Sequence, residues 1–115
     1  SLGFLPFLTG LDHVTDGGRH TWWFSEAGAV NHRVSVGNSG APYIVDIGRY
    51  VLRPGSSGEF VASCKYSSQK RLHYDSAARK WVWTKLQDLK STEEVRLARG
   101  ANNALIVNGV EFQPR

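Results

Sequence analysis

A run of 21 residues, from Lys65 to Lys85, combines the two side-chain types that bind single-stranded nucleic acid, flat aromatic rings and cations. It reads KYSSQKRLHYDSAARKWVWTK and holds six basic residues against one acid, with two tyrosines and two tryptophans. Six basic residues and one acid give this segment a formal charge of +5, whereas the whole chain has +4. The excess positive charge is therefore concentrated in this segment. Such a concentration favours an anionic partner.

The segment is expected to form a β-hairpin from strands 70–75 and 79–85. Directly opposite residues share a face of a hairpin, so the register decides which side chains accompany the tryptophans. The predicted pairs are Leu72 with Val82, Tyr74 with Lys80 and Lys70 with Thr84 on one face, and His73 with Trp81, Arg71 with Trp83 and Asp75 with Arg79 on the other.

An arginine opposite an indole costs several kcal/mol to bury, whereas in solvent it stacks on the ring for ~0.5–1 kcal/mol. The predicted tryptophan face is therefore expected to be exposed. The alternative is that both rings belong to the core, as strand tryptophans commonly do, and that the charges are simply solvated.

The function favoured by this segment is non-catalytic binding of single-stranded nucleic acid, RNA before DNA. Bases stack on aromatic rings for ~1–3 kcal/mol each, while phosphates pair with cations. No cofactor is expected, and no residue is assigned as catalytic or as a metal ligand. The predicted binding residues are Trp81, Trp83, Arg71, His73, Arg79, Lys80, Lys85, Lys70, Lys65 and Trp23.

Two other functions stay open. Exposed tryptophans on a β-sandwich also stack on sugar rings, so a carbohydrate- or partner-binding module is the first alternative; neutral sugars do not require the positive charge, whereas a sulfated glycan does. The second alternative is a small metal-independent ribonuclease. His20 and His32 fall on neighbouring predicted strands, where they could serve as general acid and base. The other histidines are His13 and His73.

Other chemistry lacks a recognisable motif. The sequence has no HxH, HExxH or CxxC pattern, and its glycine clusters lack the frame of a phosphate-binding loop. Cys64 is the single cysteine, so no intrachain disulfide forms. It alternates with apolar neighbours in FVASC, which predicts a buried and unreactive thiol.

The distribution of turn residues predicts one all-β domain over residues 1–115, a sandwich or barrel of about eight or nine short antiparallel strands. Asn108-Gly109 predicts a two-residue hairpin, and Pro54-Gly55 predicts a turn. In HTWWFS, alternation buries Trp22 with Phe24 and leaves Trp23 partly exposed. The predicted strands are 20–25, 29–36, 42–47, 49–53, 58–66, 70–75, 79–86, 104–107 and 110–113.

One segment is ambiguous. Ser91-Thr-Glu-Glu94 resembles a helix capping box and Gly100 a helix terminator, which favours a short helix at 92–99. The alternative is a strand at 94–98, because Val95 and Leu97 alternate with charged neighbours.

The remaining expectations concern partners. The chain contains no methionine, which predicts a processed product or an excised piece. No apolar run approaches the ~20 residues of a membrane-spanning helix. A homo-oligomer is possible through an exposed edge strand or the apolar N-terminus, which could equally pack on its own core. The sequence assigns no compartment.

Overall fold

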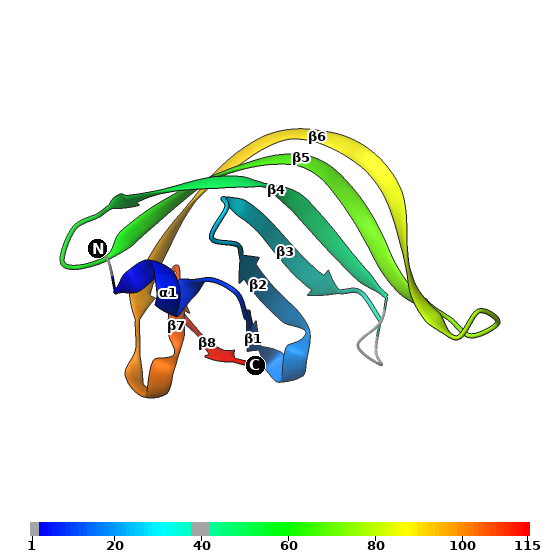
Figure 1. Ribbon diagram of the computed structural model, residues 1–115, viewed down its shortest axis with the longest axis horizontal. Coiled ribbons are helices and arrows are strands. Elements are labelled where there is room, and N and C mark those ends of the chain that lie inside the picture. The colour runs from blue at the N-terminus through cyan, green and yellow to red at the C-terminus, as the bar shows by residue number, and fades with distance from the viewer. Residues whose placement is uncertain (1–2, 38–41) are drawn as a thin grey trace.

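The computed structural model describes residues 3–37 and 42–115, which fold into an antiparallel β-barrel with its strands in sequence order (Figure 1). β1 (Asp12–Thr15) pairs with both β2 (His20–Phe24) and β8 (Val110–Pro114), and this closes the barrel. The other strands are β3 (Ala29–Ser35), β4 (Tyr43–Pro54), β5 (Phe60–Asp75), β6 (Lys80–Arg99) and β7 (Leu105–Val107). The all-β prediction is confirmed, and the architecture is a barrel.

Local turn chemistry behaves as the sequence predicts. Asn108 and Gly109 have φ values of 49° and 83°, and they join β7 to β8 with Val107 opposite Val110. Two positive φ values at these positions define the tight hairpin turn that asparagine and glycine favour. Pro54 ends β4 opposite Phe60, the first residue of β5, so the Pro54-Gly55 turn is confirmed as well.

The N-terminal segment packs on the protein's own core. A short helix, α1 (Phe4–Leu8), buries Phe4 and Leu8, and the Phe4 ring stacks on Phe60 with centroids 4.3 Å apart. Neither α1 nor β1 was predicted, because each is too short to produce a periodic pattern. Two 3₁₀ turns, η1 (Asp16–Gly18) and η2 (Ala101–Asn103), complete the described elements.

Three strands, β4, β5 and β6, are much longer than predicted. The segments 42–47 and 49–53 form the single strand β4, while 58–66 and 70–75 merge into β5. Both breaks that the sequence suggested fall at one β-bulge, because the register shifts between Ile47 and Gly48 of β4, where Ser67 of β5 has no paired residue. Small and polar residues mark bulges as readily as turns, so composition alone could not separate the two.

The predicted helix at 92–99 is wrong, since these residues belong to β6. Val95 and Leu97 are fully buried and lie opposite Ala62 and Phe60 of β5. Period-two burial against a neighbouring strand outweighs the weak capping signal of an isolated short helix. The alternative interpretation of 94–98 as a strand is correct.

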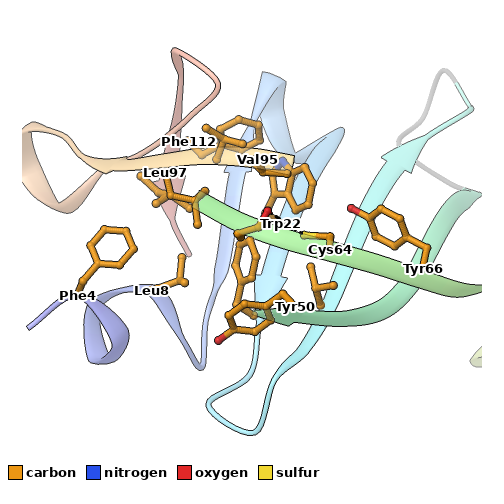
Figure 2. Close-up of a cluster of buried hydrophobic side chains, with 14 residues drawn as sticks. Phe4, Leu8, Trp22, Tyr50, Cys64, Tyr66, Val95, Leu97 and Phe112 are labelled. Carbon is orange, nitrogen blue, oxygen red and sulfur yellow. Dashed lines mark hydrogen bonds between the residues drawn. The ribbon is translucent and has the colours of Figure 1, made fainter. Parts of the chain in front are cut away.

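The core fills the inside of the barrel, where side chains from all around the sheet converge (Figure 2). Trp22 and Phe24 are 2% and 0% exposed and lie stacked, whereas Trp23 on the other face of β2 is half-buried. Cys64 is buried among them, as predicted. Alternation along β2 and β5 therefore assigned these side chains correctly.

The hairpin of β5 and β6 extends beyond the barrel as an arm, defined here as residues 68–88 (Figure 1). β4 begins at Tyr43, opposite Leu72, so the pairs from His73 outward have no β4 neighbour. The tip of the arm is thus a two-stranded ribbon that stands clear of the barrel.

Gly48 tests the bulge at the base of this arm. A Cβ atom there would lie 2.0 Å from the carbonyl oxygen of Lys65 and 2.7 Å from the Cα of Tyr66. Because the obstructing atoms are backbone, we expect Gly48→Ala to lower the free energy of unfolding by roughly 3 kcal/mol in urea denaturation. Gly3→Ala is the control, since its Cβ meets nothing within 4 Å. Equal stability of the two variants would contradict the close approach.

Candidate ligand-binding surface

The register of the arm differs by one residue from the prediction. Trp81 lies opposite Tyr74, Trp83 opposite Leu72, and Val82 opposite His73. The pairings of His73 with Trp81 and of Arg71 with Trp83 are therefore wrong, as are the other predicted pairs.

The turn at the tip explains the shift. The Asp75 carboxylate accepts hydrogen bonds from the backbone N–H groups of Ala77 and Ala78, at 3.0 and 3.1 Å. Arg79 takes a positive φ of 53° and stays in the turn, so that Asp75 pairs with Lys80. An aspartate that caps its own turn adds one residue to the loop, and that residue flips every side chain of the following strand.

The shifted register gathers aromatic rings on one face. Tyr74, Trp81 and Trp83 share the face of Leu72, and Tyr43 of β4 lies next to Leu72. Trp81 and Trp83 are 50% and 48% exposed, and Tyr74 is 50% exposed. These residues, Tyr43, Tyr74, Trp81 and Trp83, are called the aromatic surface below.

Arg33 extends this surface onto β3 and was missed by sequence reasoning. Its guanidinium lies over the Tyr43 ring, 5.1 Å from the centroid, and forms a 3.3 Å ion pair with Asp12. The sequence contained part of the information, because Arg33 and Trp23 occupy outward positions of adjacent predicted strands and could have been expected on the same face. Only the curvature of the sheet brings them to the arm.

Two neighbouring hollows line the aromatic surface and share Arg33. The larger, of about 290 Å³, lies among Arg33, Tyr43, Leu72 and Trp81. The other, of about 180 Å³, places Trp23 and Trp83 in one lining, together with Asp12, Thr21, Asn31, Arg33 and Val45. All three tryptophans predicted to bind ligand thus lie at this surface.

The predicted cations divide between several places. Lys70 and Lys85 lie opposite each other on the tryptophan face, where Lys85 also forms a 2.5 Å ion pair with Asp88. Arg71, His73 and Lys80 lie on the opposite face of the arm, and Arg79 is exposed in the turn at its tip. Lys65 lies on the barrel wall beside Arg49 and Thr92, away from the group.

A second polar site lies on the inward face of the barrel. The Nε2 atoms of His20 and His32 are in contact, with ring centroids 4.6 Å apart. A hollow of about 190 Å³ opens beside them, lined by His20, Trp22, His32, Glu93, Val107, Asn108, Val110 and Phe112. The two histidines named as acid and base therefore do meet in space.

Burial controls the protonation of this pair. Removal from water, followed by repulsion from His20, lowers the pKa of His32 to about 4. Burial also lowers the pKa of His20, although the carboxylate of Glu93 opposes that shift. Both imidazoles are therefore neutral at pH 7, so that one can accept a proton but neither is a charged acid.

The other candidate groups have structural roles. His13 is fully buried, and its Nε2 is 2.7 Å from the carbonyl oxygen of Leu8, which ties β1 to α1. Burial raises the pKa of the Cys64 thiol to about 11, which leaves it protonated and unreactive.

Within the described part of the chain, no three His, Cys, Asp or Glu side chains gather closely enough to hold a metal ion. Among residues 3–37 and 42–115, no helix has the length and apolar character needed to cross a membrane.

Comparison with known proteins gives no independent guide to function. No family model, no curated protein and no solved structure matches this chain. Functional inference therefore starts from the geometry of the two sites.

His32 makes stability depend on pH. Below pH 6.5 the unfolded chain binds a proton at His32 that the folded chain excludes until about pH 4. The free energy of unfolding is therefore highest above pH 6.5. It falls as the pH is lowered from 6.5 to about 4, by about 3 kcal/mol at most. Urea unfolding across this range, in buffer with a chelator, should show a shallower loss for His32→Gln than for wild type. His73→Gln is the control, and parallel curves for wild type and His32→Gln would refute the assignment.

Proposed function

We propose that this protein binds single-stranded nucleic acid, RNA before DNA, along the aromatic surface. The observation that supports this most directly is the position of Trp81 and Trp83, which lie half-exposed on one face of a projecting arm. Each half-exposed indole leaves apolar surface in contact with water, and stacking on a ligand would bury that surface.

The geometry of the rings supports stacking of bases. Tyr74 meets Trp81 edge-on, with centroids 5.8 Å apart and planes at 75°, and Tyr43 is tilted by 37° against Trp81. None of these pairs is stacked face to face, and Trp81 and Trp83 stay about half-exposed, which supports stacking of a ligand on them. Successive bases of a flexible strand can stack on such platforms without sequence preference.

Cations near the rings support the proposal. Lys70 and Lys85 flank Trp83 on its own face, and Arg79 projects from the turn beside Trp81. The arm is only two strands wide at its tip, so Lys80 on the opposite face adds to the same local field. Phosphates placed along the edges of the arm would gain from Lys70, Arg79 and Lys80, and from Lys85 where a phosphate displaces Asp88 from its ion pair.

A carbohydrate ligand is the second candidate. The hollow between Trp23 and Trp83 also presents Asp12, Asn31 and Arg33. Two indoles with carboxylate, amide and guanidinium groups suit a sugar ring, which combines an apolar face with hydroxyl groups. Binding of a neutral sugar would change little with salt, whereas phosphate contacts weaken steeply.

The ribonuclease alternative stays a prediction. Contact between His20 and His32 favours it, but two neutral imidazoles lack the charged acid that protonates a leaving group. Recovery of intact RNA after incubation with the protein tests this alternative directly.

Fluorescence anisotropy with a labelled single-stranded oligouridylate tests the main proposal. We expect the loss of one stacking platform, in Trp83→Ala or Trp81→Ala, to weaken binding roughly 5- to 150-fold, because stacking contributes ~1–3 kcal/mol per base. Raising the salt from about 50 to about 200 mM should weaken wild-type binding roughly 20-fold if three phosphates are contacted.

His73→Ala is the matched control, because His73 lies on the same arm but on the opposite face. It should leave affinity unchanged within about twofold. Equal loss in His73→Ala and Trp83→Ala would contradict the assigned face. Absence of binding at low salt, with tryptophan fluorescence that responds to a glycan, would favour the carbohydrate candidate.

We also propose that the arm allows self-association. β6 pairs with β7 only over Leu97–Arg99, and Asn108 occupies both backbone groups of Arg96, so along 80–95 no described strand lies on its outer edge. A second copy could add to this edge, and the bulges in β6 would limit the length of pairing. Sedimentation over about a hundredfold range of concentration should then show a dimer. A constant monomer mass across the range would exclude it.

A further inference from the structure

The His20–His32 pair lies apart from the aromatic surface. Side chains of β2 and β3 alternate between the two faces of the sheet, so His20, Trp22 and His32 point inward while Trp23 and Arg33 point outward. The inward group belongs to the mouth of the barrel, and nucleic-acid binding along the arm makes no use of it.

Both histidine rings are held in place by aromatic neighbours. The His32 ring stacks flat on Trp22, with centroids 3.8 Å apart and planes within 5°. The His20 ring meets Phe112 edge-on, with centroids 4.9 Å apart. Packing on one side of each ring leaves the Nε2 atoms directed at each other, so the convergence does not depend on flexible exposed side chains.

The surroundings favour a cation. Glu93 lines the same hollow and acts electrostatically on His20, and its carboxylate accepts a 3.0 Å hydrogen bond from the Tyr66 hydroxyl. This bond fixes a negative charge at the mouth of the barrel. The hollow of about 190 Å³ beside the rings has room for the water molecules that a metal ion retains.

We propose that His20 and His32 together bind one divalent transition-metal ion, of the class that imidazole prefers: Zn²⁺, Ni²⁺ or Cu²⁺. Each histidine contributes its Nε2 atom, and water or a small exogenous ligand fills the remaining positions on the side of the hollow. Glu93 lies outside the set of direct ligands and stabilises the bound charge. The proposed site has two protein ligands.

Sequence spacing could not suggest this site. Twelve residues separate the two histidines, whereas metal motifs place ligands two to five residues apart. Pairing of β2 with β3, with His32 opposite Trp22, brings His20 and His32 together across the strands. Two imidazole nitrogens bound to one tetrahedral ion lie about 3.3 Å apart, so the rings must move apart and turn toward the hollow to admit the metal.

Titration of the chain with ZnCl₂, NiCl₂ and CuCl₂ at about pH 7.5, after removal of any affinity tag, tests the proposal. We expect one ion per chain by calorimetry. Cu²⁺ and Ni²⁺ should quench part of the tryptophan fluorescence, because Trp22 stacks on a ligand, and Zn²⁺ should raise the melting temperature. His20→Gln and His32→Gln should each lower the affinity at least tenfold, roughly the loss of one ligand.

His73→Gln is the matched control, since it removes a histidine from the arm and should leave metal binding unchanged. Should a glutamine variant fail to fold, the imidazole ¹⁵N resonances of the wild type provide the same information. Zn²⁺ should then shift the Nε2 signals of His20 and His32 while those of His13 and His73 stay in place. No binding at millimolar metal, or equal affinity in wild type and both pair variants, would mean that the two rings share only a hydrogen bond.

Discussion

One extra residue in β5 decides which side chains face the core and which face solvent. Tyr66 lies opposite Gly48 and points into the barrel. The next pair joins Ser68 to Ile47, so Ser67 has no residue opposite it in β4. Leu72 and Tyr74 are an even number of residues from Tyr66, so in a regular strand they would point into the barrel as Tyr66 does. Because of the bulge, they lie on the outward face of the sheet instead. The absence of a side chain at Gly48 permits the close approach that the bulge requires.

The aromatic surface follows from this change of face. Without the bulge, the side of β5 that carries Leu72 would continue the core, and Trp81 and Trp83 opposite it would require burial. With it, the buried Val45 and Leu72 form a small apolar base beneath the rings on the outer side. The barrel thus has two separate aromatic layers: an inner one around Trp22 and an outer one that a ligand can reach.

The two polar sites illustrate opposite uses of burial. On the outer face, the partly exposed Arg33 guanidinium pairs with the Asp12 carboxylate and lies over the Tyr43 ring. On the inner face, burial without a full counter-charge keeps His20 and His32 neutral, which makes their nitrogen lone pairs available as ligands. The same two strands, β2 and β3, supply both environments from alternate positions.

Sequence by itself determined the features that depend on near neighbours: the all-β class, the Asn108-Gly109 hairpin, the buried Cys64, and the opposite faces of Trp22 and Trp23. Each follows from alternation or turn chemistry within a few residues. Tertiary structure decided the register of the arm, the strand at 92–99 and which residues lie beside Trp83. Those outcomes depend on the cap that Asp75 forms over its own turn, on burial of Val95 and Leu97, and on sheet curvature that brings Trp23 and Arg33 to the arm. A one-residue change in a turn or bulge exchanges the faces of a strand and leaves its composition unchanged, so composition could not reveal it.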